Sequence, residues 1–269
     1  MKRLLLLTFG LILILGCRKT EEITPSPNIW IENHQVYMDS GNRITKITTT
    51  DANNKFMWDA SYSYSDSLVI ITKNVSVEEL IQGKSKPCVF MRTYLTTYKI
   101  GQNGFAEYSI DTSFSSEDPG WMTVESSNKV WYAYDQAGYI RSSICYYDTS
   151  YYSSYFDSTH YTFLGGNLIN LNERNSMGSM EQHTYSYYDT INKIDLLRMG
   201  CANGIAGKIN QHLIKKEISQ YGWPMTDPME SVYHYILNSD GYVTEQTMTT
   251  TSQYGRTTIN IDRYTYIFN

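Results

Sequence analysis

The chain has 269 residues, of which 22 are Lys or Arg and 27 are Asp or Glu, so its formal net charge is −5. This acidic balance excludes the basic face by which proteins bind nucleic acids, and no nucleic-acid partner is expected. The chain also contains 25 Tyr but only 8 Phe. Because Tyr favours the half-buried surface of a strand, this bias predicts an all-β protein whose antiparallel sheet has partly solvated faces.

The N-terminus has the order of a secretory leader. Basic residues at 2–3 precede an apolar run at 4–15, which Gly16 and Cys17 close. The run is shorter than the roughly 20 residues of a membrane span. Its ending, ILGC, resembles the lipobox of bacterial lipoproteins. That resemblance implies cleavage before Cys17 and acylation of its thiol and amine, so residues 1–17 are expected to be a signal peptide ending at a lipidated Cys17.

Residues 18–28 combine charged residues with a Pro- and Ser-containing stretch. Such a segment cannot bury a core and is expected to be a flexible tether. Lys19 followed by Glu21 and Glu22 resembles the signal that sends Bacteroidetes lipoproteins to the outer face of the outer membrane. The resemblance implies an outer-membrane lipoprotein displayed at the cell surface, with the periplasmic face as the alternative.

Residues 29–269 are expected to form a single domain, because no second linker-like stretch interrupts them. Beyond the lipobox the cysteines are Cys88, Cys145 and Cys201, an odd number without a CxxC pair. A disulfide scaffold is therefore not expected. Each cysteine is expected to be a small buried residue, and one disulfide with a leftover thiol stays open.

One unit recurs along this domain: alternating aromatic residues, a turn rich in Gly, Asn, Asp or Ser, and an apolar restart. Its seven copies lie at 36–44, 62–68, 94–105, 132–140, 161–167, 185–192 and 233–243. The alternation is that of a strand, and the turn residues are those of hairpins. Because the copies are unevenly spaced, they predict an antiparallel meander and not a propeller or solenoid. The alternating segment Arg263–Phe268 is expected to close the sheet.

One segment has helical spacing. Within residues 208–219, Ile209, Leu213, Ile214 and Ile218 recur as on one face of a helix. The sequence therefore predicts one short helical excursion near 208–219.

The unit at 132–140, YAYDQAGYI, is similar to the YD repeats of Rhs-type surface proteins. The leader together with residues 185–196, 210–216 and 233–243 resembles more closely a family of tyrosine-rich Bacteroidetes lipoproteins of unknown function, named for a porin-like fold. The resemblance implies a curved or barrel-like antiparallel sheet. It supplies no catalytic residues.

A search for catalytic motifs finds no nucleophile elbow, HExxH, P-loop, GxGxxG or calcium loop. The five histidines (His34, His160, His183, His212 and His234) show no metal-ligand spacing, so neither a metal nor another cofactor is expected. His183 and His234 lie in strand-like stretches, where an ordinary strand-face imidazole is the favoured interpretation. Glu117 and Asp118 before Trp121 suit a sugar or cation site, but a plain acidic turn is favoured.

The densest aromatic stretch is at 146–156, and its consecutive rings cannot all face a core, so some are expected to be exposed. The candidate residues for a glycan-stacking platform are Trp121, Tyr151, Tyr152, Tyr155 and Trp223. Cross-strand aromatic packing is the favoured alternative, because aromatics occur in every hairpin.

These observations favour a non-enzymatic, lipid-anchored envelope protein that binds a glycan or another envelope protein. The first alternative is a glycan-acting hydrolase with unidentified carboxylates. The second is a structural β-barrel scaffold. A membrane-spanning version of that barrel is disfavoured, because strand positions opposite the Tyr rows are largely Ser, Thr and Asp, whereas a spanning barrel needs an apolar outer band.

Overall fold

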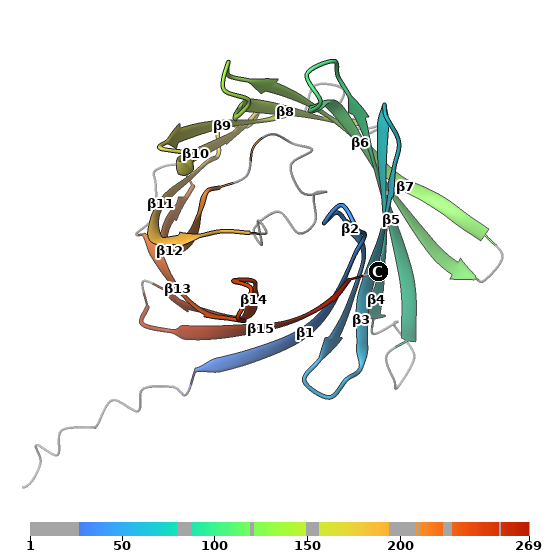
Figure 1. The fold of residues 1–269 in the computed structure, drawn as a ribbon. Coiled ribbons are helices and arrows are strands. Elements are labelled where there is room, and N and C mark those ends of the chain that lie inside the picture. Colours follow the sequence, from blue (N-terminus) through green and yellow to red (C-terminus); the bar gives the residue numbers. More distant parts are fainter. Residues whose placement is uncertain are drawn as a thin grey trace, which may run out of the picture.

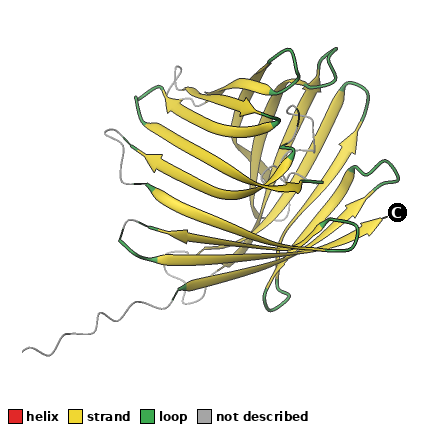
Figure 2. Ribbon diagram, turned by 60° about the vertical axis from the view of Figure 1, so that its left-hand side comes forward, coloured by secondary structure: helices red, strands yellow, loops and turns green. Residues whose placement is uncertain are grey.

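The computed structural model describes residues 27–79, 88–118, 121–148, 156–193, 208, 210–222, 228–252 and 254–268. These residues form fifteen strands and no helix (Figures 1 and 2). The strands are β1 (Asn28–Met38), β2 (Ile44–Asp51), β3 (Phe56–Tyr64), β4 (Leu68–Glu79), β5 (Cys88–Ile100), β6 (Ala106–Asp118), β7 (Trp121–Tyr134), β8 (Ile140–Asp148), β9 (Phe156–Leu164), β10 (Asn167–Asn175), β11 (Met180–Ile191), β12 (His212–Tyr221), β13 (Met229–Leu237), β14 (Val243–Thr251) and β15 (Thr257–Phe268).

The strands close into one barrel, which Figure 1 shows as a ring. Each strand pairs antiparallel with the next along the chain, and β15 pairs with β1. The closing pair is parallel because an odd number of alternating strands leaves the first and last pointing the same way. The all-β fold, the meander and the closure by the last strand are thus confirmed. Closure gives each of the described strands a pairing partner on both sides.

Alternation along each strand separates an inner face from an outer face. On β1, His34, Val36 and Met38 are buried and point inward, whereas Gln35, between His34 and Val36, is exposed. Val36 lies opposite Ile47, which in turn lies opposite Ala60, so the inward row continues from strand to strand. Tyrosines belong to the same inner face: Tyr62, Tyr98, Tyr233 and Tyr264 are buried.

Several hairpin turns share one design. In the turn at 39–43, Asp39 Oδ1 accepts backbone hydrogen bonds from Gly41 and Arg43, each 2.9 Å long, and Asn42 has a φ of 59°. The turns at 51–55, 101–105, 135–139, 175–179, 238–242 and 252–256 repeat the main-chain pattern. Each has Gly or Asn with positive φ at its fourth position, as three-residue hairpin loops require. The predicted turn chemistry is therefore the chemistry that forms the hairpins.

Paired tyrosines stabilise the bulges beside these turns. The β1–β2 ladder shifts register after Ile44, and the Tyr64 hydroxyl of β3 donates to the Ile44 carbonyl at 2.7 Å. Tyr64 is the second tyrosine of a Tyr-x-Tyr pair, and the second tyrosine of three other pairs does the same at three other bulged hairpins. There the hydroxyl donates to a backbone carbonyl, from Tyr134 to Ala106, from Tyr187 to Leu168 and from Tyr266 to Val243. A bulge frees a carbonyl from the ladder, and a buried carbonyl needs a partner. These four tyrosines therefore have a structural role.

The two ends of the barrel differ. The core end is the end at which β1 finishes, with the turns 39–43, 101–105, 135–139 and 238–242. It holds the buried cluster Val36, Met38, Ile44, Ile47, Ala60, Tyr62, Val69, Ile71, Tyr98, Ala106, Leu213, Val243 and Tyr264. The N-terminal end is the end at which β1 begins, with the turns 51–55, 175–179 and 252–256. A barrel of this many strands is too wide for side chains alone to fill.

The helix predicted near 208–219 is wrong, because residues 212–221 are strand β12. A bulge causes the misleading pattern. Ser186 lies opposite Lys216 but Tyr187 lies opposite Ile214, so Leu213 and Ile214 are both buried and the period of two is broken. The predicted turn after Tyr187 is likewise not a short hairpin, since β11 continues to Ile191 and β12 begins at His212.

The described part of the connection between β11 and β12 contacts turns at the core end. The Lys208 amide donates to the Gly138 carbonyl at 3.0 Å, and the Gln211 amide donates to the Gly166 carbonyl at 3.1 Å. This connection therefore joins the β7–β8 turn to the β9–β10 turn.

The outer face carries polar pairs between neighbouring strands. Lys216 Nζ lies 2.6 Å from Glu230 Oε2, and Arg263 Nε lies 3.1 Å from Glu245 Oε2. A Lys or Arg facing lipid at the middle of a bilayer costs about 2–4 kcal/mol. The outer face of β12–β15 therefore carries charged side chains. Among the described residues, no helix is long and apolar enough to cross a membrane.

Candidate ligand pocket at the N-terminal end

A pocket of about 450 Å³ lies between β1, β2, β3 and β4 at the N-terminal end. Its lining includes Trp30, Glu32, Asp51, Phe56, Trp58 and Ser76. A larger hollow of about 580 Å³ beside the β10–β11 turn is lined by Arg174, Met177, Gly178, Ser179 and Met180, without an aromatic ring or a carboxylate. The pocket between β1 and β4 therefore has the richer recognition chemistry.

Both aromatic rings and carboxylates line this pocket. Trp30 is 66% exposed, and Trp58 is partly buried with Lys73 Nζ 4.3 Å from its ring centroid. Glu32 of β1 lies opposite Asp51 of β2 in the ladder. Indole faces pack against the apolar face of a ligand, and carboxylates accept hydrogen bonds from its hydroxyls, so the lining suits a polyhydroxylated molecule.

Lys73 brings a positive charge to the same wall. Burial lowers the pKa of Lys73, and the negative charge of Glu32 acts in the opposite direction. The ammonium group lies over the Trp58 ring, where a cation is attracted to the π face. Lys73 thereby helps to fix the Trp58 ring as a wall of the pocket.

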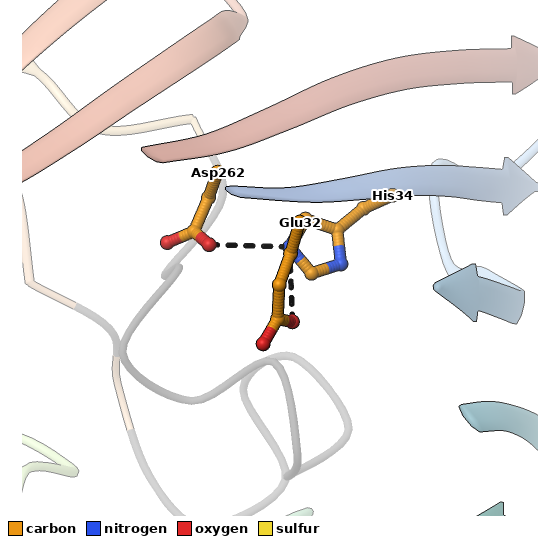
Figure 3. Close-up of side chains that lie close together, drawn as sticks. All are labelled: Glu32, His34 and Asp262. Carbon is orange, nitrogen blue, oxygen red and sulfur yellow. Dashed lines mark ion pairs between the residues drawn. The ribbon is translucent and has the colours of Figure 1, made fainter. Parts of the chain in front are cut away.

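His34 lies next to the pocket, between Glu32 on its own strand and Asp262 on β15 (Figure 3). Its Nε2 is 3.5 Å from Asp262 Oδ1 and 3.9 Å from Glu32 Oε2. Its Nδ1 is 2.8 Å from Thr49 Oγ1, and its ring stacks on Tyr264 with 4.9 Å between centroids. The imidazole is 7% exposed and Thr49 is fully buried, so the ring is held in one orientation.

A second inward histidine lies across β11 and β12. His183 Nε2 is 2.6 Å from Glu181 Oε1, and His183 Nδ1 is 2.6 Å from Glu217 Oε1. Tyr233 donates to Glu217 Oε2 at 2.8 Å. Burial alone lowers the pKa of His183, but the hydrogen bonds and charges of Glu217 and Glu181 outweigh it, and the pKa is raised. Burial likewise opposes ionisation of Glu217, yet hydrogen bonds from His183 and Tyr233 lower its pKa.

Other titratable groups occupy the inner wall between these two clusters. Burial raises the pKa of Asp111 and of Glu173. Tyr147 donates a short hydrogen bond to Asp157. Cys145 is a free thiol, and burial raises its pKa. Its side chain is only partly buried, so the expectation that each cysteine is a small buried residue is met in part. The described inner wall at this level is acidic and polar.

The predicted aromatic platform lies almost entirely outside the described residues. Tyr151, Tyr152, Tyr155 and Trp223 are not described, and Trp121 is described only by its backbone in β7. The lipidation residue Cys17, and the cysteines Cys88 (side chain) and Cys201, also fall outside the described part. The platform and the anchor therefore stay predictions.

The expectation of exposed rings at 146–156 is confirmed at both ends of that stretch. Tyr146 is 50% exposed and Phe156 is 40% exposed, and the two residues pair between β8 and β9. Next to them on the outer face, Trp131 is 41% exposed and packs on Tyr108 with 5.0 Å between ring centroids. Lys129 Nζ lies over the rings of Tyr108 and Trp131. We call Tyr108, Trp131, Tyr146 and Phe156 the outer aromatic strip.

Sequence reasoning missed the residues of the pocket. Trp30, Glu32 and His34 alternate on one face of a strand, a signal that was present in the printed sequence. Asp262 could not have been found in this way, because it is 228 residues from His34 and meets the cluster only through the β1–β15 closure.

Comparisons with known proteins show a similar fold. A porin-like protein from Bacteroides uniformis has a TM-score of 0.50 and 14% sequence identity, over 83% of this chain and 84% of that chain. A porin-like protein from Bacteroides vulgatus has a TM-score of 0.48 and 14% identity, over 85% of this chain and 98% of that chain. No family model and no curated protein matches the sequence. The porin-like fold implied by the sequence resemblance is thus supported, whereas membership of the lipoprotein family stays a hypothesis.

Proposed function

We propose that the protein is a non-enzymatic binding protein of the cell envelope, and that it holds a glycan in the pocket at the N-terminal end. The observation that carries the proposal is the pairing of an exposed indole, Trp30, with the carboxylates of Glu32 and Asp51 around one concavity. The ring supplies a stacking surface and the carboxylates supply acceptors for hydroxyl groups.

The rigidity of the pocket wall supports binding. Asp51 Oδ1 accepts backbone hydrogen bonds of 2.8 Å from both Asn53 and Lys55, which fixes its position in the turn. Trp58 is covered by Lys73 on one side. A wall that is ordered before the ligand arrives loses less conformational entropy on binding.

The location is proposed from the leader and from the polar outer face. Lipidation of Cys17 would attach the protein to a membrane, and the porin-like fold of a Bacteroides protein is consistent with an outer-membrane address. The outer ion pairs favour a barrel that stands in water over one that spans the bilayer. The eleven residues from Cys17 to Asn28 would span at most about 35–40 Å if fully extended. Because β1 begins at the pocket end, this tether would join the barrel at that end.

Replacing one exposed indole tests the glycan site. A glycan array first identifies a glycan that the protein binds. Calorimetry with EDTA present then measures the affinity for that glycan, and Trp30→Ala should reduce this affinity at least tenfold. The matched control is Trp131→Ala, which removes an exposed indole from the outer face and should leave glycan affinity unchanged. Equal affinity in Trp30→Ala and the unmodified protein would contradict the pocket assignment. Release of shortened products from a bound glycan would favour the hydrolase alternative instead.

The anchor is tested by detergent partitioning and by labelling with fatty acid. Cys17→Ser should leave the precursor unprocessed by the lipoprotein signal peptidase and without acyl chains, so the protein should no longer behave as a lipoprotein in detergent partitioning. Incorporation of labelled fatty acid into the Cys17→Ser variant would overturn the anchor.

A second candidate ligand is a protein that docks on the outer aromatic strip. The specific observation is that Trp131, Tyr146 and Phe156 are exposed on three neighbouring strands of the outer face, and aromatic residues are enriched in the centres of protein interfaces. The same two variants separate the candidates. If an envelope protein co-purifies with the unmodified protein and with Trp30→Ala but not with Trp131→Ala, the outer aromatic strip is favoured as its docking surface.

A further inference from the structure

We propose that Glu32, His34 and Asp262 form a binding site for a divalent transition metal ion such as Zn²⁺ or Mn²⁺, on the inner wall of the barrel beside the pocket. One ligand atom from each of the three residues lies within 4.8 Å of the others. The site goes beyond glycan binding, since it concerns a different ligand and can be measured without any sugar.

The backbone places the three side chains on one face. Glu32 and His34 are two residues apart on β1, so both point inward, and Asp262 lies directly opposite Glu32 in the parallel ladder of β1 and β15. Figure 3 shows both carboxylates turned toward the same nitrogen of His34. The cluster therefore exists because β1 and β15 pair in the closed barrel. In an open sheet these two strands would lie at opposite edges, and Asp262 would not lie beside Glu32.

The separations suit an ion better than a shared proton. Donors at 2.0–2.2 Å from a tetrahedral ion stand about 3.4 Å apart. The distances from His34 Nε2 to Asp262 and Glu32 are 3.5 Å and 3.9 Å, beyond hydrogen-bond length. At His183 both carboxylates lie at 2.6 Å, and each ring nitrogen already has a carboxylate partner. The chain therefore contains a proton-sharing cluster at His183 and, at His34, a cluster with room for a cation.

The surroundings of His34 are those of a metal ligand. Thr49 Oγ1, 2.8 Å from Nδ1, can accept a hydrogen bond from Nδ1–H and leave Nε2 with a lone pair for the ion. Gln246 donates to Asp262 Oδ2 at 3.4 Å, which helps to orient the other oxygen toward His34. One imidazole and two carboxylates suit Zn²⁺ or Mn²⁺.

The pocket gives the site a route of entry. Glu32 is shared between the cluster and the pocket lining, and Trp58, whose ring centroid is 6.0 Å from that of His34, lines the same pocket. Three protein ligands leave further coordination positions of the ion for water or for an oxygen of a ligand in the pocket. The proposed ion would therefore be exchangeable.

The test is metal binding to the full-length protein, purified in detergent and stripped with EDTA. Titration with Co²⁺ should give visible d–d absorption bands that saturate at one equivalent, and Zn²⁺ should displace them. Asp262→Asn should weaken Co²⁺ affinity at least tenfold. Thr49→Val, which keeps the shape of the side chain, should weaken it about 10- to 100-fold through loss of the Nδ1 partner.

The matched control is Glu181→Gln, which alters the carboxylate next to His183 and should leave the stoichiometry and the absorption bands unchanged. Far-UV circular dichroism of each variant separates loss of the site from loss of the fold. Absence of bands at millimolar Co²⁺, or an unchanged Co²⁺ affinity in correctly folded Asp262→Asn, would overturn the proposal. Because no glycan is present, neither result depends on the pocket ligand.

Discussion

The core end and the N-terminal end of the barrel are built on the same strands but hold different chemistry, and β1 shows the change within eleven residues. Its inward positions are Trp30, Glu32 and His34 near the N-terminal end, followed by Val36 and Met38 at the core end. The alternation is the same throughout, and only the inward residue types change. The core end thus supplies stability, and the N-terminal end is where polar side chains can serve a ligand.

The largest effect on stability should come from the core end. Met38→Ala removes a side chain that is 1% exposed and should lower the free energy of unfolding by about 2–5 kcal/mol, because the cavity is only partly refilled. On the same strand, Trp30→Ala should change it by less than about 0.5 kcal/mol. Urea unfolding of both variants measures the difference. Similar losses at both positions would break the division between the two ends.

An intermediate effect is expected at the tyrosine–carbonyl bonds. Tyr64→Phe leaves the Ile44 carbonyl without its hydroxyl partner and should cost about 1–3 kcal/mol. Burial raises the pKa of Tyr64 to about 12, in agreement with a hydroxyl kept in its protonated, donating form. The control is Tyr37→Phe. The Tyr37 hydroxyl donates to Gln35 at an exposed site, so its removal should lower the free energy of unfolding by less than about 0.5 kcal/mol. If the two variants are equally stable, the tyrosines do not hold the bulges.

The smallest effect should be a pH dependence from the His183–Glu217 pair. The pKa of His183 is raised above 6.5, so its contribution is full below pH 6.5 and is lost as the pH rises through the raised value. The pKa of Glu217 is lowered below 4.5, so its contribution is present above pH 4.5 and is lost as the pH falls through the lowered value. The pair should therefore stabilise the fold most between pH 4.5 and 6.5.

Urea unfolding of the unmodified protein and of Glu217→Gln, at about pH 5.5 and about pH 9, measures this contribution. The stability gap between the two proteins should be larger at the lower pH, and His183→Gln should remove the same pH-dependent part. A gap that widens toward pH 9 would show that the pair carries no such charge interaction.

The sequence predicted the hairpins better than the site. Turns such as 135–139 were recognisable because a short polar residue, a positive-φ position and flanking alternation are all local features. Six of the seven predicted units form hairpins, and the exception at 185–192 leads into the long connection before β12, the strand for which a helix is predicted. The bulge that buries both Leu213 and Ile214 is set by pairing with β11, which no local window contains.

The sequence by itself determined an all-β meander, its turn chemistry and the alternation of its tyrosines along the strands, because alternation and turn residues act within a few positions of one another. Only the tertiary structure decided that fifteen strands close, that the closing pair is parallel, and that Asp262 meets His34. The physical reason is that closure depends on the number, tilt and register of all strands together. A residue pair more than two hundred positions apart becomes a neighbour only when every intervening strand has taken its place.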